Sequence, residues 1–303
     1  MGLANAALMI TVLLWGSMLP VLDVLLRQYD PFTLNVARYV MAIPLSLTML
    51  RLAEKGPLLP RGVPALRILW LGGGIAGFVM LFSFGIIYSD TLTAIAIMAA
   101  GPVVANLVAR FGFGEPPAPG IALGLTASVA GGMLAMLDLS KGGFEIGFGG
   151  GEPLLVASTA CWAWYSLAAQ RWMRGLSQMR ITGLTVPAAG LWVFAAYLVL
   201  MVAGHVPTPP PMPGFREVGL IAWSALGGAS IAVFLWNYGV RHIGIQVASM
   251  FVNLTPIVGV LVAIWLGATP RIEQLLGGAL IVGAVIWVQT RRKKTAAITD
   301  APA

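Results

Sequence analysis

The feature that most constrains this chain is a repeat that spans half its length. The segment from Gln246 to Pro270 matches an earlier segment at an offset of 154 residues, the separation between Pro102 and Pro256. The same offset aligns three further pairs, Gly85 with Gly239, Ala94 with Ala248, and Pro116 with Pro270. Four pairs in one register, without a gap, indicate an internal duplication. Each copy is an apolar stretch long enough to cross a bilayer, with a proline near its middle that a helix in water rarely tolerates.

Composition places the duplicated units in a membrane. Of the 303 residues, 58% are hydrophobic and 10% are charged, and the mean hydropathy is +0.88, which is too apolar for a water-soluble globule. The single cysteine, Cys161, excludes a disulfide framework and a thiolate metal site. The net charge of +7 comes from basic residues scattered at the ends of apolar segments, which argues against a nucleic-acid-binding patch.

The apolar segments predict an all-α membrane protein with ten transmembrane helices, arranged as two five-helix repeats over residues 1–145 and 146–303. The second repeat ends in a basic tail. The predicted spans are residues 3–26, 32–52, 66–88, 91–113, 119–138, 152–173, 180–203, 217–240, 246–268 and 272–290. The loops between them are too short to hold a folded soluble domain, so the function is expected to lie within the bilayer.

The distribution of basic residues predicts that both termini are cytoplasmic. With that orientation, 13 of the 18 basic residues lie on the cytoplasmic side. They are Arg51, Lys55, Arg61, Arg67, Arg110, Arg171, Arg174, Arg180, Arg241 and the run from Arg291 to Lys294. The opposite side holds only four, Arg27, Lys141, Arg216 and Arg271. This asymmetry follows the positive-inside rule.

An odd number of spans in each repeat means that the second copy enters the membrane in the opposite direction from the first. Inverted repeats are typical of secondary transporters that work by alternating access, with the substrate site near the midplane. A weaker match supports the duplication in the first helix of each unit, where Trp15 aligns with Trp162 at an offset of 147 residues.

The paired halves, together with three short motifs, resemble the EamA-type family of the drug/metabolite transporter superfamily. The motifs are Leu14–Ser17, Trp162–Ser166, and the small residues around Pro102 and Pro256. Within that family, Trp236–Gly239 followed by His242 is similar to the bacterial aromatic amino-acid exporters. The resemblance implies a multi-pass protein of the bacterial inner membrane. One departure is that Glu115, which follows the fourth span, has Thr269 as its repeat partner.

The two mid-helix prolines are the first candidates for the substrate site. Each removes a backbone donor, which leaves the carbonyl four residues earlier, Met98 or Val252, without its helical partner. A free carbonyl is tolerated in the bilayer only where protein or a water-lined cavity satisfies it. Pro102 and Pro256 therefore either line the site or only let the helices bend, and both readings stay open.

Aromatic and polar residues on the same spans are the second group of candidates, because buried indole, phenol and amide groups need partners inside the bundle. For any one of them, an interfacial position or a helix–helix hydrogen bond is the competing interpretation. The predicted substrate-binding set is Trp15, Ser17, Tyr88, Met98, Pro102, Trp162, Trp164, Tyr165, Trp236, Asn237, Tyr238, Ser249, Asn253 and Pro256.

Charge within the spans is scarce. Asp23 and Arg38 lie inside predicted spans at similar depth near the outer surface, and we expect either a structural ion pair or a role in gating or proton coupling. A central cavity without fixed charge favours a zwitterionic amino acid whose ring stacks on aromatic walls. The alternatives are efflux of lipophilic cations, which would gain from a buried acid, and a passive channel for small metabolites.

Other functional classes find little support. The two histidines, His205 and His242, are near span ends with no acid cluster, so we expect no metal, no cofactor and no enzyme activity. The expected partners are a small-molecule substrate and the lipid bilayer, and a monomer is the expected state.

Overall fold

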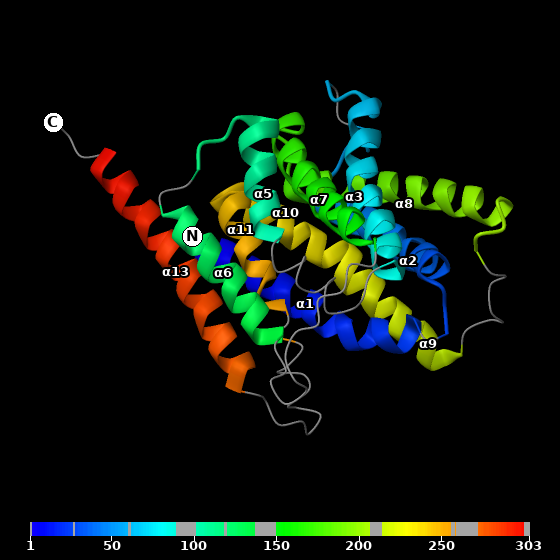
Figure 1. Cartoon of the computed structure of the whole chain (residues 1–303). Coiled ribbons are helices and arrows are strands. Elements are labelled where there is room, and N and C mark those ends of the chain that lie inside the picture. The colour runs from blue at the N-terminus through cyan, green and yellow to red at the C-terminus, as the bar shows by residue number, and fades with distance from the viewer. Residues whose placement is uncertain are drawn as a thin grey trace.

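The computed structural model describes residues 2–26, 28–59, 62–88, 101–117, 120–136, 150–206, 214–255, 258 and 272–299, and within these ranges every regular element is a helix (Figure 1). The α-helices are α1 (Gly2–Leu26), α2 (Pro31–Ala53), α3 (Ala65–Ile87), α5 (Gly101–Leu107), α6 (Ile121–Met136), α7 (Glu152–Trp172), α8 (Gln178–Val202), α9 (Phe215–Ala222), α10 (Ala232–Ile243), α11 (Ile245–Val252) and α13 (Ile272–Thr299). Two π-helices, η1 (Val108–Gly112) and η3 (Trp223–Ile231), continue α5 and α9. The predicted all-α class is confirmed for this part of the chain.

Several helices have the length and composition of membrane spans. Among the described residues, four are long and apolar enough to cross a bilayer. They are Pro31–Ala53, Ala65–Gly85, Gln178–Val202 and the continuous stretch Phe215–Ile243. Their outer surfaces are apolar, as at Val199 and Val202, which are 68% and 85% exposed. Apolar side chains that face outward in this way are suited to lipid.

Glycines let several helix pairs pack closely. A Cβ atom on Gly124 of α6 would lie 2.1 Å from Val288 of α13, and one on Gly131 would lie 2.7 Å from the carbonyl oxygen of Gly277. The contacting residue number on α13 decreases from 288 to 277 as that on α6 increases from 124 to 131, so the two helices are antiparallel. Figure 1 shows them side by side at one edge of the bundle. Small residues at such contacts are typical of helix packing in membranes.

Contacts between the helices recur at the two offsets found in the sequence. A Cβ on Gly85 of α3 would lie 2.6 Å from Leu155 of α7, and one on Gly239 of α10 would lie 2.4 Å from Leu8 of α1. Gly85 and Gly239 are 154 residues apart, and Leu8 and Leu155 are 147 apart. The same two offsets relate the contact of Gly74 with Tyr165 to that of Gly228 with Met18. The packing of α7 on α3 is therefore repeated by α1 on α10.

The π-helix η3 interrupts the predicted span 217–240, which runs on to Ile243. Because π-helical turns are wider than α-helical ones, backbone carbonyls of η3 can accept hydrogen bonds from side chains of neighbouring helices. Such π-helical turns are often found at functional sites. Thus the indole Nε1 of Trp15 donates to the carbonyl oxygen of Gly228 at 3.2 Å. The apolar pattern of residues 217–240 predicts one continuous helix and gives no sign of this interruption.

A hydrogen bond and an ion pair connect the end of α2 to the start of α8, outside the apolar part of the helices. Glu54 follows α2 and accepts a hydrogen bond from the hydroxyl of Ser177, the N-cap of α8. Its other carboxylate oxygen lies 2.7 Å from Nε of Arg180. The Ser177 hydrogen bond, followed by the contact with Arg180, lowers the pKa of Glu54 below its ordinary value, although partial burial opposes the shift.

Replacing Glu54 by glutamine is expected to remove a small pH-dependent contribution to stability. Because folding lowers the pKa of this carboxyl, the stabilisation is present at neutral pH and is lost as the pH falls through the folded pKa. The pair is partly solvent-exposed, so the effect should be at most about 1 kcal/mol. Thermal unfolding in detergent at neutral and acidic pH would measure it. An equal difference between wild type and Glu54→Gln at both pH values would contradict the assignment.

Candidate functional site

Five aromatic side chains meet where helices of the two halves cross. This aromatic cluster consists of Trp15 on α1, Phe78 on α3, Trp162 and Tyr165 on α7, and Trp236 on α10. The ring of Trp162 is at its centre, with centroids 5.6 Å from Trp15, 5.3 Å from Phe78 and 5.8 Å from Trp236. These tilted and edge-on contacts are the favoured geometries of aromatic pairs. Trp162 and Tyr165 share one helix face because they are three residues apart.

Hydrogen bonds fix the orientation of two of the indoles. Trp236 is 1% exposed, and its Nε1 donates to Oγ of Ser166 at 2.8 Å. Trp15 is held by the η3 carbonyl described above. Trp15 and Trp162 are only partly buried. The cluster therefore combines a fully buried ring, that of Trp236, with two partly buried tryptophans.

A polar cluster adjoins the aromatic cluster on the side of α8. This α8 polar cluster consists of Tyr165, Thr182, Thr185 and Asn237. The hydroxyl of Tyr165 is 3.2 Å from that of Thr185, and Nδ2 of Asn237 donates to Tyr165 at 2.8 Å and to Thr182 at 3.2 Å. All four side chains are buried. Oδ1 of Asn237 has no hydrogen-bond partner in the described part of the chain.

A second polar cluster, here called the α2 polar cluster, consists of Met18, Asn35, Arg38 and Ser83. Nδ2 of Asn35 donates to the hydroxyl of Ser83 at 3.1 Å, and Nη1 of Arg38 donates to Oδ1 of Asn35 at 3.1 Å. Nη2 of Arg38 lies 3.9 Å from the sulfur of Met18. Arg38 thus brings a cation into a group of neutral partners.

The two polar clusters occupy equivalent positions in the two halves. Offsets of 147 residues relate Met18 to Tyr165, Asn35 to Thr182 and Arg38 to Thr185, and the offset of 154 relates Ser83 to Asn237. The hydrogen bond between Asn35 and Ser83 therefore has its counterpart between Thr182 and Asn237. The aromatic cluster connects them, because it includes Tyr165 and because Trp15 lies one helical turn from Met18.

Removing the hydroxyl of Tyr165 is expected to destabilise the protein. In Tyr165→Phe, Nδ2 of Asn237 loses its shorter hydrogen bond in a buried environment, which costs about 1–3 kcal/mol. Tyr88→Phe is the control, because Tyr88 is 56% exposed. Unfolding midpoints in detergent would compare the two, and equal midpoints would show that the α8 polar cluster does not hold the helices together.

Other predicted residues lie away from the aromatic cluster. Trp164 packs against Trp172, with ring centroids 5.3 Å apart, and against Gly74 of α3. Tyr88 is exposed at the end of α3. The ring of Tyr238 stacks near His242, with centroids 4.2 Å apart.

The remaining predictions fall on α1, α5 and α11 or outside the described residues. The hydroxyl of Ser17 donates to its own helix at Leu14, and that of Ser249 to its own helix at Gln246. Nδ2 of Asn253 donates to the backbone and hydroxyl of Ser128 on α6. Pro102 is buried, and its carbonyl accepts from Asn106 at 2.8 Å. Met98, Pro256 and the side chain of Asp23 lie outside what the structure describes, so their roles stay predictions.

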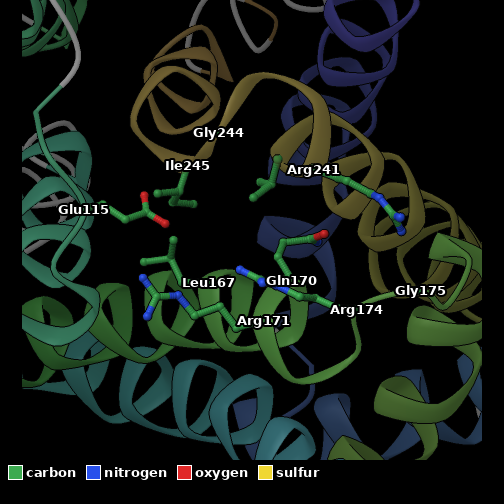
Figure 2. Close-up of a pocket in the computed structure, with 10 residues that line it drawn as sticks. Glu115, Leu167, Gln170, Arg171, Arg174, Gly175, Arg241, Gly244 and Ile245 are labelled. Carbon is green, nitrogen blue, oxygen red and sulfur yellow. The ribbon is translucent and has the colours of Figure 1, made fainter.

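A pocket of about 360 Å³ opens at the end of α7, near the turn from α10 to α11 (Figure 2). Gly244 makes this turn with a positive φ of 79°, which favours glycine. The lining residues are Glu115, Leu167, Gln170, Arg171, Arg174, Gly175, Val240, Arg241, Gly244 and Ile245. None of them is in the predicted set. The three arginines lie at the ends of α7 and α10, and the sequence pattern predicts only their side of the membrane, although their convergence also marks a cationic pocket.

The pocket is adjacent to the α8 polar cluster. Nε2 of Gln170 donates to the backbone carbonyl of Asn237 at 3.4 Å. Arg171 donates to the carbonyl of Phe113 and lies over its ring, and Nη1 of Arg241 donates to the carbonyl of Leu176 at 2.7 Å. Figure 2 shows Arg171 and Glu115 on one side of the pocket and Arg174 and Arg241 on the other. Three guanidinium groups against one carboxylate make the pocket attractive to anions.

Comparisons with known proteins agree with this architecture. The uncharacterized inner membrane transporter YedA of Escherichia coli K12 is 25% identical over 92% of this chain and 89% of its own length. A probable terminal-alkyne amino-acid exporter of Streptantibioticus cattleyicolor is 26% identical over 94% of this chain and 93% of its own length. A solved crystal structure shares the fold, with a TM-score of 0.81 at 19% identity, covering 96% of this chain and 98% of its own.

The family assignment rests on both halves of the chain. The model of the EamA-like transporter family matches residues 2–137 and again residues 149–290. The relatives are named as transporters, among them YyaM of Bacillus subtilis, which is 24% identical over 70% of this chain and 69% of its own length. No enzyme activity is associated with these relatives. The chain belongs to the EamA-like transporter family and is a membrane transporter.

Proposed function

We propose that this transporter exports small apolar or aromatic metabolites, in particular aromatic amino acids, from the cytoplasm across the bacterial inner membrane by alternating access. The observation that carries the proposal is the aromatic cluster around Trp162, which offers partly buried indole rings between helices of the two halves. A ring-bearing substrate would stack there in place of one aromatic neighbour. The amino-acid exporter among the relatives supports the amino-acid part of the substrate.

Alternating access would come from two inverted five-helix units, residues 1–145 and 146–303. Two matches to one family model support the duplication, as do the contacts that recur at offsets of 147 and 154 residues. The antiparallel pairing of α6 with α13 is what a two-fold axis in the membrane plane would produce between equivalent helices. Rocking of one unit against the other would expose the aromatic cluster to each side in turn.

In the proposed orientation, the pocket in Figure 2 is the cytoplasmic mouth. Arg171, Arg174 and Arg241 all belong to the basic residues that the positive-inside rule places in the cytoplasm. Their charge would draw the carboxylate of an amino acid toward the α8 polar cluster. The same charge, together with Arg38, disfavours a cationic drug as substrate.

Uptake into proteoliposomes tests the proposal. Labelled phenylalanine is expected to enter with saturable kinetics, to be accelerated by unlabelled phenylalanine on the opposite side, and to be displaced by tryptophan and tyrosine. Linear flux without counter-transport would indicate a channel. Displacement by tetraphenylphosphonium and not by amino acids would indicate efflux of lipophilic cations.

A further inference from the structure

We propose that Arg38 of the α2 polar cluster binds the carboxylate of the transported substrate. The inference rests on the proposed function and deepens it, because it restricts the substrates to molecules with a free carboxylate. In the proposed orientation, Arg38 lies about 10 Å from the outer end of α2, since it is seven positions after Pro31 and each position adds about 1.5 Å. The site would therefore belong to the outer half of the transport path.

The contacts of the guanidinium leave its charge without a counterion among the described side chains. Nη1 donates to the amide oxygen of Asn35 at 3.1 Å, and Nη2 reaches only the carbonyl of Ser224 at 3.4 Å and the sulfur of Met18 at 3.9 Å. The last two are long contacts to neutral acceptors. Nε is buried and has no partner at all in the described structure. The edge formed by Nε and Nη2 thus carries only these two long contacts.

The edge formed by Nε and Nη2 has the geometry that carboxylates require. A guanidinium presents parallel N–H groups, which bind both oxygens of a carboxylate. The resulting charge-assisted hydrogen bonds are stronger than those between neutral groups. An amide in place of the carboxylate would keep the shape and lose the negative charge. Discrimination between an amino acid and its amide is therefore the property that Arg38 would confer.

The equivalent cluster in the second half shows that the fold does not require a cation at this position. There Thr185 replaces Arg38, and its hydroxyl meets that of Tyr165, the counterpart of Met18. The α8 polar cluster packs the equivalent helices of the second half, α7, α8 and α10, with neutral, buried side chains. Because an arginine inside a membrane span is costly, its presence in only one of two equivalent clusters points to a ligand and not to packing.

Arg38 also borders the aromatic cluster. A Cβ on Gly228 would lie 3.6 Å from Nη2 of Arg38, and the carbonyl of the same glycine accepts the indole N–H of Trp15. A substrate whose ring contacts Trp15 would therefore have its carboxylate within reach of Arg38. Stacking and charge recognition would be combined in one molecule, as an aromatic amino acid requires.

Competition in proteoliposomes tests the inference. Uptake of labelled phenylalanine by wild type is expected to be inhibited about tenfold more strongly by phenylalanine than by phenylalaninamide. In Arg38→Gln this ratio should fall to about two or less, and in Arg38→Lys, which keeps the charge but not the fork, it should be intermediate. Arg51→Gln removes an exposed guanidinium from the other end of α2 and should leave the ratio unchanged.

The outcomes separate this inference from the proposed function. If wild type takes up phenylalanine but does not distinguish it from phenylalaninamide, the inference about Arg38 is wrong, while amino-acid transport stands. This result comes from wild type alone and does not depend on whether a variant folds. If wild type takes up no amino acid, the proposed function fails and the inference falls with it. If Arg38→Gln combined with Asp23→Asn restores the wild-type ratio, Arg38 serves an ion pair with Asp23 and the inference is overturned.

Discussion

Replacing Trp236 by alanine is expected to lower the free energy of unfolding by about 3–5 kcal/mol, the range for removing a large aromatic side chain from a packed core. Trp236 is 1% exposed and contacts the rings of Trp15 and Trp162, with centroids 5.6 Å and 5.8 Å away. Its loss would leave a cavity between α1, α7 and α10. It would also remove the donor to the hydroxyl of Ser166, which itself donates to the carbonyl of Trp162. We also expect phenylalanine transport to be lost, because the cluster that would bind the ring collapses.

Trp70→Ala provides the matched control, because Trp70 is 57% exposed on α3 and its removal creates no cavity. Unfolding with sodium dodecyl sulfate in mixed micelles would give both free energies. Trp236→Phe separates the two contributions, since it keeps most of the ring and removes the hydrogen bond to Ser166. Equal stability of Trp236→Ala and Trp70→Ala would contradict the central role of the aromatic cluster.

Adding one methyl group at Gly72 is expected to destabilise the packing of α3 on α8 by about 1–3 kcal/mol. A Cβ on Gly72 would lie 2.5 Å from the carbonyl carbon of Ala188 and 2.6 Å from the backbone nitrogen of Ala189. Because these are backbone atoms, a side-chain rotation cannot relieve the overlap and the helices must separate. The higher helix propensity of alanine recovers at most about 1 kcal/mol.

Gly283→Ala is the control for this change. Gly283 lies in α13, and a Cβ there would meet nothing within 4 Å, so only the gain in helix propensity remains. The variant should be as stable as wild type or slightly more stable. If Gly72→Ala matched it in the same unfolding assay, α3 and α8 could not be as close as the structure places them.

The sequence predicts the helical class and a large part of the aromatic cluster, because both depend on local pattern. The sequence predicts Trp15, Trp162 and Trp236 as site residues because their indole N–H groups lie inside apolar spans, and the structure brings them together. Trp164 was selected with them but faces Gly74 and Trp172. Helix geometry explains the difference, since Trp164 is two residues from Trp162 and points away from the face that Trp162 shares with Tyr165.

Features that depend on contacts between distant segments were not predictable. The residues of the π-helix η3 do not differ in composition from those of an ordinary apolar helix. Its role is apparent only from the structure, in which its backbone carbonyls accept hydrogen bonds from Trp15 and Arg38. The equivalence of the two polar clusters escaped sequence comparison because Arg38 and Thr185 share no chemistry. The equivalence becomes apparent only from the contacts, since Arg38 contacts Met18 just as Thr185 contacts Tyr165.

Labelling of single cysteines from each side of the membrane tests the central claim, that the two units are inverted. Lys55 and Ala203 are exposed just beyond the ends of the equivalent helices α2 and α8. In a Cys161→Ala background, we expect Lys55→Cys to react with an impermeant maleimide only from the cytoplasmic side and Ala203→Cys only from the periplasmic side. Reaction of both cysteines from the same side would show that the two units run in the same direction and would contradict the account.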